Sequence, residues 1–106
     1  MICGLRLAIG ALMLFASSAH AGRVVTLAPH LAELVCAAGA CAQLVGVVKH
    51  SDYPAEVLQR TQVGDAFAVN AEAVLALKPD LVLSWEGGTP EQTVARLRRV
   101  GLRVEP

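Results

Sequence analysis

Residues 70–88 read NAEAVLALKPDLVLSWEGG, and this stretch decides the fold. Asn70 is a residue type that caps helices, and the apolar side chains after it recur at helical spacing. The helix is expected to end at Lys78, because the residue before a proline avoids the helical conformation. The run 81–85 is apolar on both faces, which is typical of a strand in a parallel sheet covered on both sides. The stretch therefore predicts a helix that leads into a buried parallel strand.

Strands and helices continue to alternate on both sides of this stretch. Apolar and β-branched runs predict strands, and helical spacing predicts helices. The expected strands are 23–28, 44–48, a brief 62–64 and 102–105, and the expected helices are 30–39, 54–60 and 89–100. Thr89 is expected to cap the last helix, with Pro90 at its first position. Because repeated strand–helix units form a mainly parallel sheet flanked by helices, the predicted fold class is α/β.

Length, charge and composition exclude several classes of protein. The chain has 106 residues, which is the size of one small domain. Nine basic and nine acidic side chains give a formal net charge of zero. Nucleic-acid binding needs a clustered excess of Lys and Arg, so the neutral balance argues against it. A hydrophobic content of 55% excludes intrinsic disorder.

The segment 1–21 has the pattern of a cleaved secretory signal peptide. Arg6 precedes an apolar run at 7–16, and the segment ends in the small-x-small sequence Ala-His-Ala. The run is shorter than the roughly 20 residues that a membrane-spanning helix needs. An N-terminal anchor that is never cut is the alternative. We expect an exported protein whose mature domain covers residues 22–106.

Cys36 and Cys41 are expected to form a disulfide, because exported proteins fold in an oxidising compartment. Their spacing differs from the Cys-x-x-Cys of thiol oxidoreductases, and two cysteines are too few for a structural zinc site. A pair of buried thiols is the alternative. Cys3 lies in the predicted signal peptide and would leave with it.

Aromatic and imidazole side chains are expected at one edge of the sheet. Ligands of open α/β sheets bind beyond the carboxyl ends of the strands. The ring-bearing residues that follow the expected strands are His30, His50, Tyr53, Phe67 and Trp85. Such a rim suits a large planar or apolar ligand. The alternatives are core packing for the aromatic rings and ordinary surface positions for the histidines.

Four segments in a fixed order make the sequence similar to a known family. They are RVVTLAPHLAELVCAAG (23–39), LVGVVKHSDYP (44–54), QVGDAFAVNAEAVLALKPDLVLSWEGG (62–88) and RLRRVGLRV (96–104). The sequence resembles the N-terminal lobe of periplasmic cobalamin (vitamin B12)-binding proteins of ABC importers. More broadly, it resembles the two-lobed binding proteins for cobalamin, haem and iron–siderophores. The resemblance implies two α/β lobes that clamp a ligand, of which this chain would be the first, truncated before the second.

The resemblance also implies roles for individual residues. Tyr53 and Trp85 would stack on the corrin ring of cobalamin, which is a transported ligand rather than a cofactor. His50 stands where close relatives have Tyr, and Phe67 stands where they offer Trp, so both are expected ligand contacts. An imidazole can also coordinate iron or cobalt, which keeps haem open as an alternative ligand. Glu72 would dock onto the membrane permease.

The alternatives to a binding lobe are an enzyme and a fragment that binds nothing. The sequence has no Gly-x-Ser-x-Gly turn, phosphate-binding Gly-rich loop or His-Glu-x-x-His motif. His30 or His50 with Asp52 or Asp65 are the candidates for a hydrolytic site, without an evident nucleophile. A truncated fragment that binds nothing would expose an apolar lobe surface. The prediction is a binding lobe that is not an enzyme.

Overall fold

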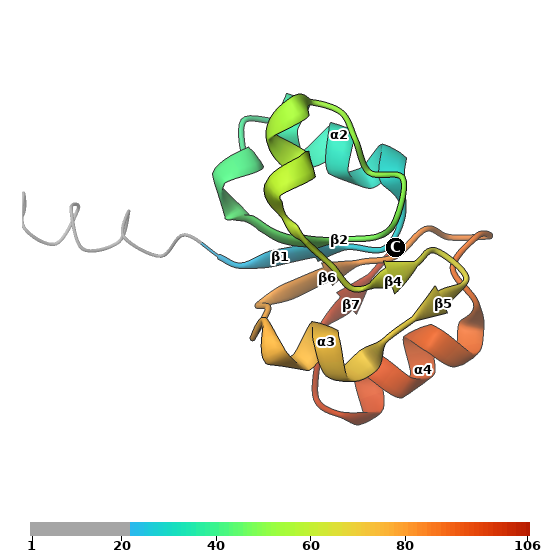
Figure 1. Cartoon of the computed structure of the whole chain (residues 1–106). Coiled ribbons are helices and arrows are strands. Elements are labelled where there is room, and N and C mark those ends of the chain that lie inside the picture. Colours follow the sequence, from blue (N-terminus) through green and yellow to red (C-terminus); the bar gives the residue numbers. More distant parts are fainter. Residues whose placement is uncertain (1–21) are drawn as a thin grey trace, which may run out of the picture.

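A five-stranded parallel sheet is the centre of the computed structural model, which describes residues 22–106. The predicted signal peptide at 1–21 and its Cys3 lie outside the described residues. The strands lie in the order β3-β2-β1-β6-β7 and every neighbouring pair is parallel (Figure 1). Their bounds are β1 Val24–Thr26, β2 Leu44–Val47, β3 Thr61–Gln62, β6 Leu81–Leu83 and β7 Val104–Glu105. The predicted α/β class with a mainly parallel sheet is confirmed.

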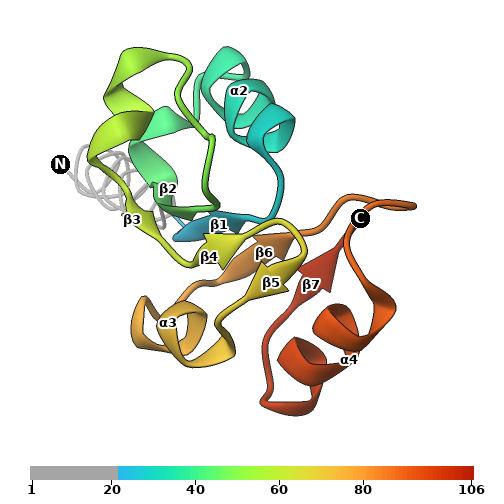
Figure 2. The ribbon, with the colours of Figure 1, turned by 45° about the vertical axis from the view of Figure 1, so that its right-hand side comes forward.

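Helices cover both faces of this sheet. Their bounds are α2 Pro29–Ala37, α3 Ala71–Ala76 and α4 Glu91–Arg99, with short 3₁₀ helices η1 Cys41–Gln43 and η2 Ala55–Gln59. Figures 1 and 2 show α2 over one face and α3 with α4 over the opposite face. Among residues 22–106, no helix combines the length and the apolar character that crossing a membrane requires.

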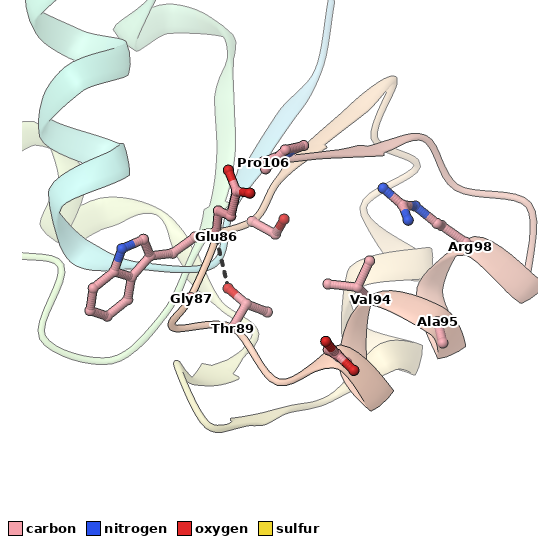
Figure 3. Close-up of a pocket in the computed structure, with 10 residues that line it drawn as sticks. Glu86, Gly87, Thr89, Val94, Ala95, Arg98 and Pro106 are labelled. Carbon is pink, nitrogen blue, oxygen red and sulfur yellow. Dashed lines mark hydrogen bonds between the residues drawn. The ribbon is translucent and has the colours of Figure 1, made fainter.

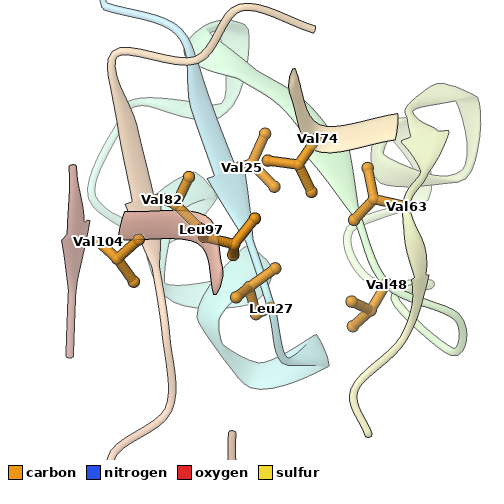
Figure 4. Close-up of a cluster of buried hydrophobic side chains, with 8 residues drawn as sticks. All are labelled: Val25, Leu27, Val48, Val63, Val74, Val82, Leu97 and Val104. Atoms are coloured by element: carbon orange, nitrogen blue, oxygen red, sulfur yellow. The ribbon is translucent and has the colours of Figure 1, made fainter. Parts of the chain in front are cut away.

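Two clusters of buried side chains fix the helices on the sheet. The first joins α3 and α4 to one face and consists of Val25, Leu27, Val48, Val63, Val74, Val82, Leu97 and Val104 (Figure 4). The second joins α2 and η2 to the other face and consists of Val24, Ala32, Leu44, Val47 and Val57. Neighbouring strand residues point to opposite faces, so Val24 and Val25 enter different clusters.

The brief strand predicted at 62–64 is wrong in its bounds, and a hairpin follows it. Strand β3 ends at Gln62, and β4 (Gly64–Asp65) then pairs antiparallel with β5 (Ala68–Val69). The Asp65 Oδ1 atom closes the turn by accepting from the amides of Phe67 (2.8 Å) and Ala68 (2.9 Å). Gly64 has a φ of 120°, and a Cβ there would collide with the carbonyl oxygen of Ala68. The hairpin places Phe67 at its tip.

One predicted helix cap is confirmed and one is wrong. Asn70 Oδ1 accepts from the amides of Glu72 (3.0 Å) and Ala73 (3.1 Å), as expected for an N-cap. Thr89 was expected to cap α4, but that helix begins at Glu91 without a side-chain cap. The Thr89 hydroxyl instead accepts a hydrogen bond from the Trp85 amide at 2.8 Å.

The predicted disulfide between Cys36 and Cys41 is present, with the two Cα atoms 4.0 Å apart. It ties the end of α2 to η1. The Arg60 Nη2 atom donates to the Cys41 carbonyl oxygen at 3.2 Å, which joins this loop to the end of η2. The bridge therefore stabilises the α2 side of the sheet.

Removing the disulfide should lower the free energy of unfolding by about 2 kcal/mol, because a short closed loop restricts the unfolded chain. The double variant Cys36→Ala, Cys41→Ala can be compared with the parent by urea unfolding. Dithiothreitol should destabilise the parent by the same amount and leave the double variant unchanged. Equal stability of oxidised and reduced parent protein would contradict this role.

Candidate functional site

The reversal of strand order places a crevice beside β1. The chain runs from β1 outward to β2 and β3, then returns to β6 on the other side of β1. Such a switch point is where open α/β sheets bind ligands, at the carboxyl ends of the strands. His30 follows β1, His50 follows β2 and Trp85 follows β6, so all three lie at this edge.

A cavity of about 320 Å³ lies at the crevice. It is formed by the loops after β1, β2 and β6 and by the β4–β5 hairpin. Its lining residues are Pro29, Lys49, His50, Asp65, Ala66, Phe67 and Trp85. The structure thus brings together three of the four predicted ligand contacts: His50, Phe67 and Trp85. Lys49, which the sequence analysis did not single out, adds a cationic side chain.

Tyr53, the fourth predicted contact, is not among the residues that line this cavity. It lies in the loop after β2, before the cis peptide bond to Pro54. This loop leads from the end of β2 to η2. Tyr53 is 67% exposed and Phe67 is 71% exposed, so neither ring packs in the core.

Trp85 is held by its own loop, although its side chain is 44% exposed. The Trp85 carbonyl oxygen accepts from the amides of Gly88 (2.9 Å) and Thr89 (2.8 Å). The bond from the Trp85 amide to the Thr89 hydroxyl is the dashed line in Figure 3. The His30 ring stands edge-on to the indole, with ring centroids 5.1 Å apart and planes at 80°. Trp85 therefore has a defined orientation without being buried.

His50 has a backbone conformation that few residues other than glycine adopt, with a φ of 74°. The turn is closed on one side by the bond from the Ser51 amide to the Val48 carbonyl oxygen, at 3.2 Å. The Lys49 amide donates to the Gly64 carbonyl oxygen at 2.8 Å, which ties this loop to the hairpin. Backbone strain of this kind is often found at ligand sites. Histidine is one of the non-glycine residues that adopt this conformation more often than most.

Of the candidates for a hydrolytic site, His50 and Asp65 line the same cavity. The Asp65 carboxylate accepts two backbone amides of its own turn. In the part of the chain that the structure describes, no three His, Cys, Asp or Glu side chains gather in a way that would hold a metal ion.

A second hollow of about 400 Å³ lies beside the first, between the Trp85 loop and α4 (Figure 3). Glu86, Thr89, Val94 and Arg98 are among its lining residues. The sequence favoured a solvated face for the arginines of α4. Arg96, Arg98 and Arg99 are exposed, as expected, and the Arg98 Nη2 atom also donates to the Val104 carbonyl oxygen at 2.8 Å.

Glu72, the predicted docking residue, does not line the cavity. It is exposed in the first turn of α3, where the helix dipole favours a carboxylate. Within residues 22–106, its carboxylate is in no ion pair.

Comparison with curated proteins confirms the resemblance, although no family model matches the chain. The chain is 40% identical over 91 residues to the vitamin B12-binding protein of Vibrio cholerae serotype O1, covering 86% of this chain and 33% of that protein. The protein of the same name from Pectobacterium carotovorum is 40% identical over 95 residues, covering 90% of this chain and 34% of that protein. The chain thus spans about one third of the length of these relatives.

Solved structures agree with this similarity. The periplasmic vitamin B12-binding protein BtuF of Vibrio cholerae superimposes with a TM-score of 0.74 at 39% identity, over 79% of this chain and 33% of that one. A periplasmic haem-binding protein of Pseudomonas aeruginosa also gives 0.74, at 37% identity, over 79% of this chain and 30% of that one. The haem-binding protein RhuT of Roseiflexus gives 0.72 at 31% identity, over 78% and 32%.

Fold, cavity and coverage together define a single lobe of the type found in periplasmic binding proteins. Over most of its length, the chain is a homologue of the vitamin B12-binding proteins and, at lower identity, of the haem-binding ones. The names of these relatives describe binding proteins rather than enzymes.

Proposed function

We propose that this chain is the N-terminal lobe of a substrate-binding protein that collects cobalamin or a related corrinoid in the periplasm for an ABC importer. The observation that carries this function is the cavity at the strand ends, where His50, Phe67 and Trp85 meet. The 40% identity to vitamin B12-binding proteins supports the choice of ligand. The role is binding and delivery, without catalysis, in a protein exported through residues 1–21.

The exposed rings favour a large, flat and partly apolar ligand. Tyr53, Phe67 and Trp85 are all largely exposed, and Phe67 and Trp85 line the same cavity. Apolar surface that is gathered in this way usually marks a binding site. A macrocycle would cover these rings and gain from stacking on them. A single lobe is expected to bind the ligand more weakly than two lobes together, because it buries less of the ligand surface.

Haem is the second candidate ligand, and His50 is the observation that favours it. Its imidazole lines the cavity, and a neutral imidazole is a common iron ligand. Lys49 beside it would suit the carboxylates of haem. The likeness to the haem-binding proteins agrees with this alternative.

Parallel titrations with cyanocobalamin and haemin test the ligand. Trp85 is the only tryptophan in the sequence, so its fluorescence reports directly on the proposed site. Cyanocobalamin should quench it in a saturable manner, after correction with free tryptophan for absorbed light. A Soret shift with haemin that is lost in His50→Ala, together with a flat cyanocobalamin titration, would replace cobalamin by haem.

Glu72 is proposed to dock on a cationic surface of the permease. In the full-length binding protein, Glu72→Lys should reduce cobalamin uptake by at least about tenfold, because a charge reversal places like charges opposite each other. Its cobalamin affinity should stay within about twofold of the parent, since the residue is exposed and lies outside the cavity.

Glu33→Lys is the matched control for this variant. Glu33 is also exposed, but it lies on α2, on the other face of the sheet. Uptake by vesicles that contain the importer should fall for Glu72→Lys alone. An equal fall for both variants, or a loss of ligand binding in Glu72→Lys, would contradict the docking role.

A further inference from the structure

We propose that Gly88 and Thr89 are positioning residues that fix the orientation of the Trp85 indole at the rim of the cavity. The two residues act on different parts of Trp85, one on the ring and one on the backbone. The positioning is a property of the chain without ligand. Its consequence for affinity rests on the proposed function.

Gly88 is needed because the indole lies against its backbone. A Cβ atom built at Gly88 would overlap the Cδ2, Cε3 and Cζ3 atoms of Trp85. These carbons belong to the fused ring, so no small rotation of a flexible chain end relieves the collision. Gly87, in contrast, has a φ of 85° and open space where a Cβ would lie. A tight turn explains Gly87, whereas close packing of the indole explains Gly88.

Thr89 fixes the backbone from which the indole projects. Its hydroxyl accepts from the Trp85 amide, and its own amide donates to the Trp85 carbonyl oxygen, both at 2.8 Å. This reciprocal pair explains why Thr89 does not cap α4. The loop 85–89 is thereby closed at the residue that carries the ring.

The loop must fix the orientation of the Trp85 indole, because burial alone does not fix it. Nearly half of the Trp85 side chain is exposed, so its rotamer would otherwise be weakly restricted. Immobilising a mobile side chain on binding costs about 0.5–1.5 kcal/mol. A ring already held by Gly88 and Thr89 avoids this cost, which corresponds to a gain in affinity of about two- to tenfold.

The experiment compares Gly88→Ala with Gly101→Ala by Trp85 fluorescence in the absence of ligand. Gly101 has a φ of 94° and open space for a Cβ, and it follows α4 rather than the Trp85 loop. Gly101→Ala should therefore destabilise the protein without changing the emission. Gly88→Ala should change the emission maximum and the quenching by acrylamide, because the indole must leave its position. Far-UV circular dichroism verifies that both variants fold.

Thr89→Val and Thr89→Ser provide a second test that keeps Gly88 intact. Valine has a similar shape but cannot accept the bond from Trp85, whereas serine retains the hydroxyl. Thr89→Val should change the emission, and Thr89→Ser should resemble the parent. Both Gly88→Ala and Thr89→Val should bind cyanocobalamin about two- to tenfold more weakly.

Unchanged emission and acrylamide quenching in folded Gly88→Ala and Thr89→Val would overturn the positioning role. Changed emission in a protein that binds neither cyanocobalamin nor haemin would support the positioning of Trp85 and contradict the proposed function. Failure of the positioning role is therefore distinguishable from failure of the proposed binding function.

Discussion

Replacing Trp85 with alanine should weaken cyanocobalamin binding by about 30-fold, or about 2 kcal/mol, which is the size of effect seen when a central aromatic contact is removed. The indole lines the cavity and leaves a large apolar surface open to a ligand. Because more than half of Trp85 is buried, far-UV circular dichroism verifies that the variant folds. Equilibrium dialysis measures the affinity, since the variant contains no tryptophan for fluorescence.

Two further variants make this result specific. Trp85→Phe keeps an aromatic ring and should lose less affinity than Trp85→Ala. Leu34→Ala removes another exposed apolar side chain, on α2, and should leave the affinity unchanged. If Trp85→Ala bound cyanocobalamin as tightly as the parent, Trp85 would not be a ligand contact.

Replacing Leu97 with alanine should lower the free energy of unfolding by about 2–5 kcal/mol. Leu97 lies on α4, is 1% exposed and belongs to the cluster that joins this helix to the sheet (Figure 4). Truncation would leave a cavity between α4 and the strands that carry Val82 and Val104. The loss is large beside the stability of roughly 5–15 kcal/mol that a typical domain has.

Val100→Ala is the matched control, because Val100 lies at the end of the same helix and is 45% exposed. Its effect on urea unfolding should stay within about 0.5 kcal/mol. An equal effect of both substitutions would contradict the packing of α4 on the sheet.

Local chemistry allowed much of the fold to be predicted from the sequence. The apolar runs at 24–26, 44–47 and 81–83 are strong strand signals, and Asn70 marks a helix start that the structure confirms. The β4–β5 hairpin was missed because its strands have two residues each, too few for an alternating pattern. Thr89 was misassigned because its hydroxyl accepts from the Trp85 amide within the loop 85–89, and this bond competes with helix capping.

The topology predicts which edge of the sheet carries the site, but it does not predict every residue that lines the cavity. The rule for strand ends places His50, Phe67 and Trp85 at one edge, and the structure adds that they share a cavity. The rule does not separate these three residues from Tyr53, which lies in the loop after β2 but does not line the cavity. Lys49 also follows β2, but it was missed because only ring-bearing side chains were selected at the strand ends.

Equilibrium dialysis of the purified, oxidised protein against cyanocobalamin tests the central claim most directly. One-to-one, saturable binding is expected, with a dissociation constant between about 1 µM and 1 mM for a single lobe, and it should weaken in Trp85→Ala. No retention of cyanocobalamin up to about 1 mM would contradict the claim that this lobe binds a corrinoid.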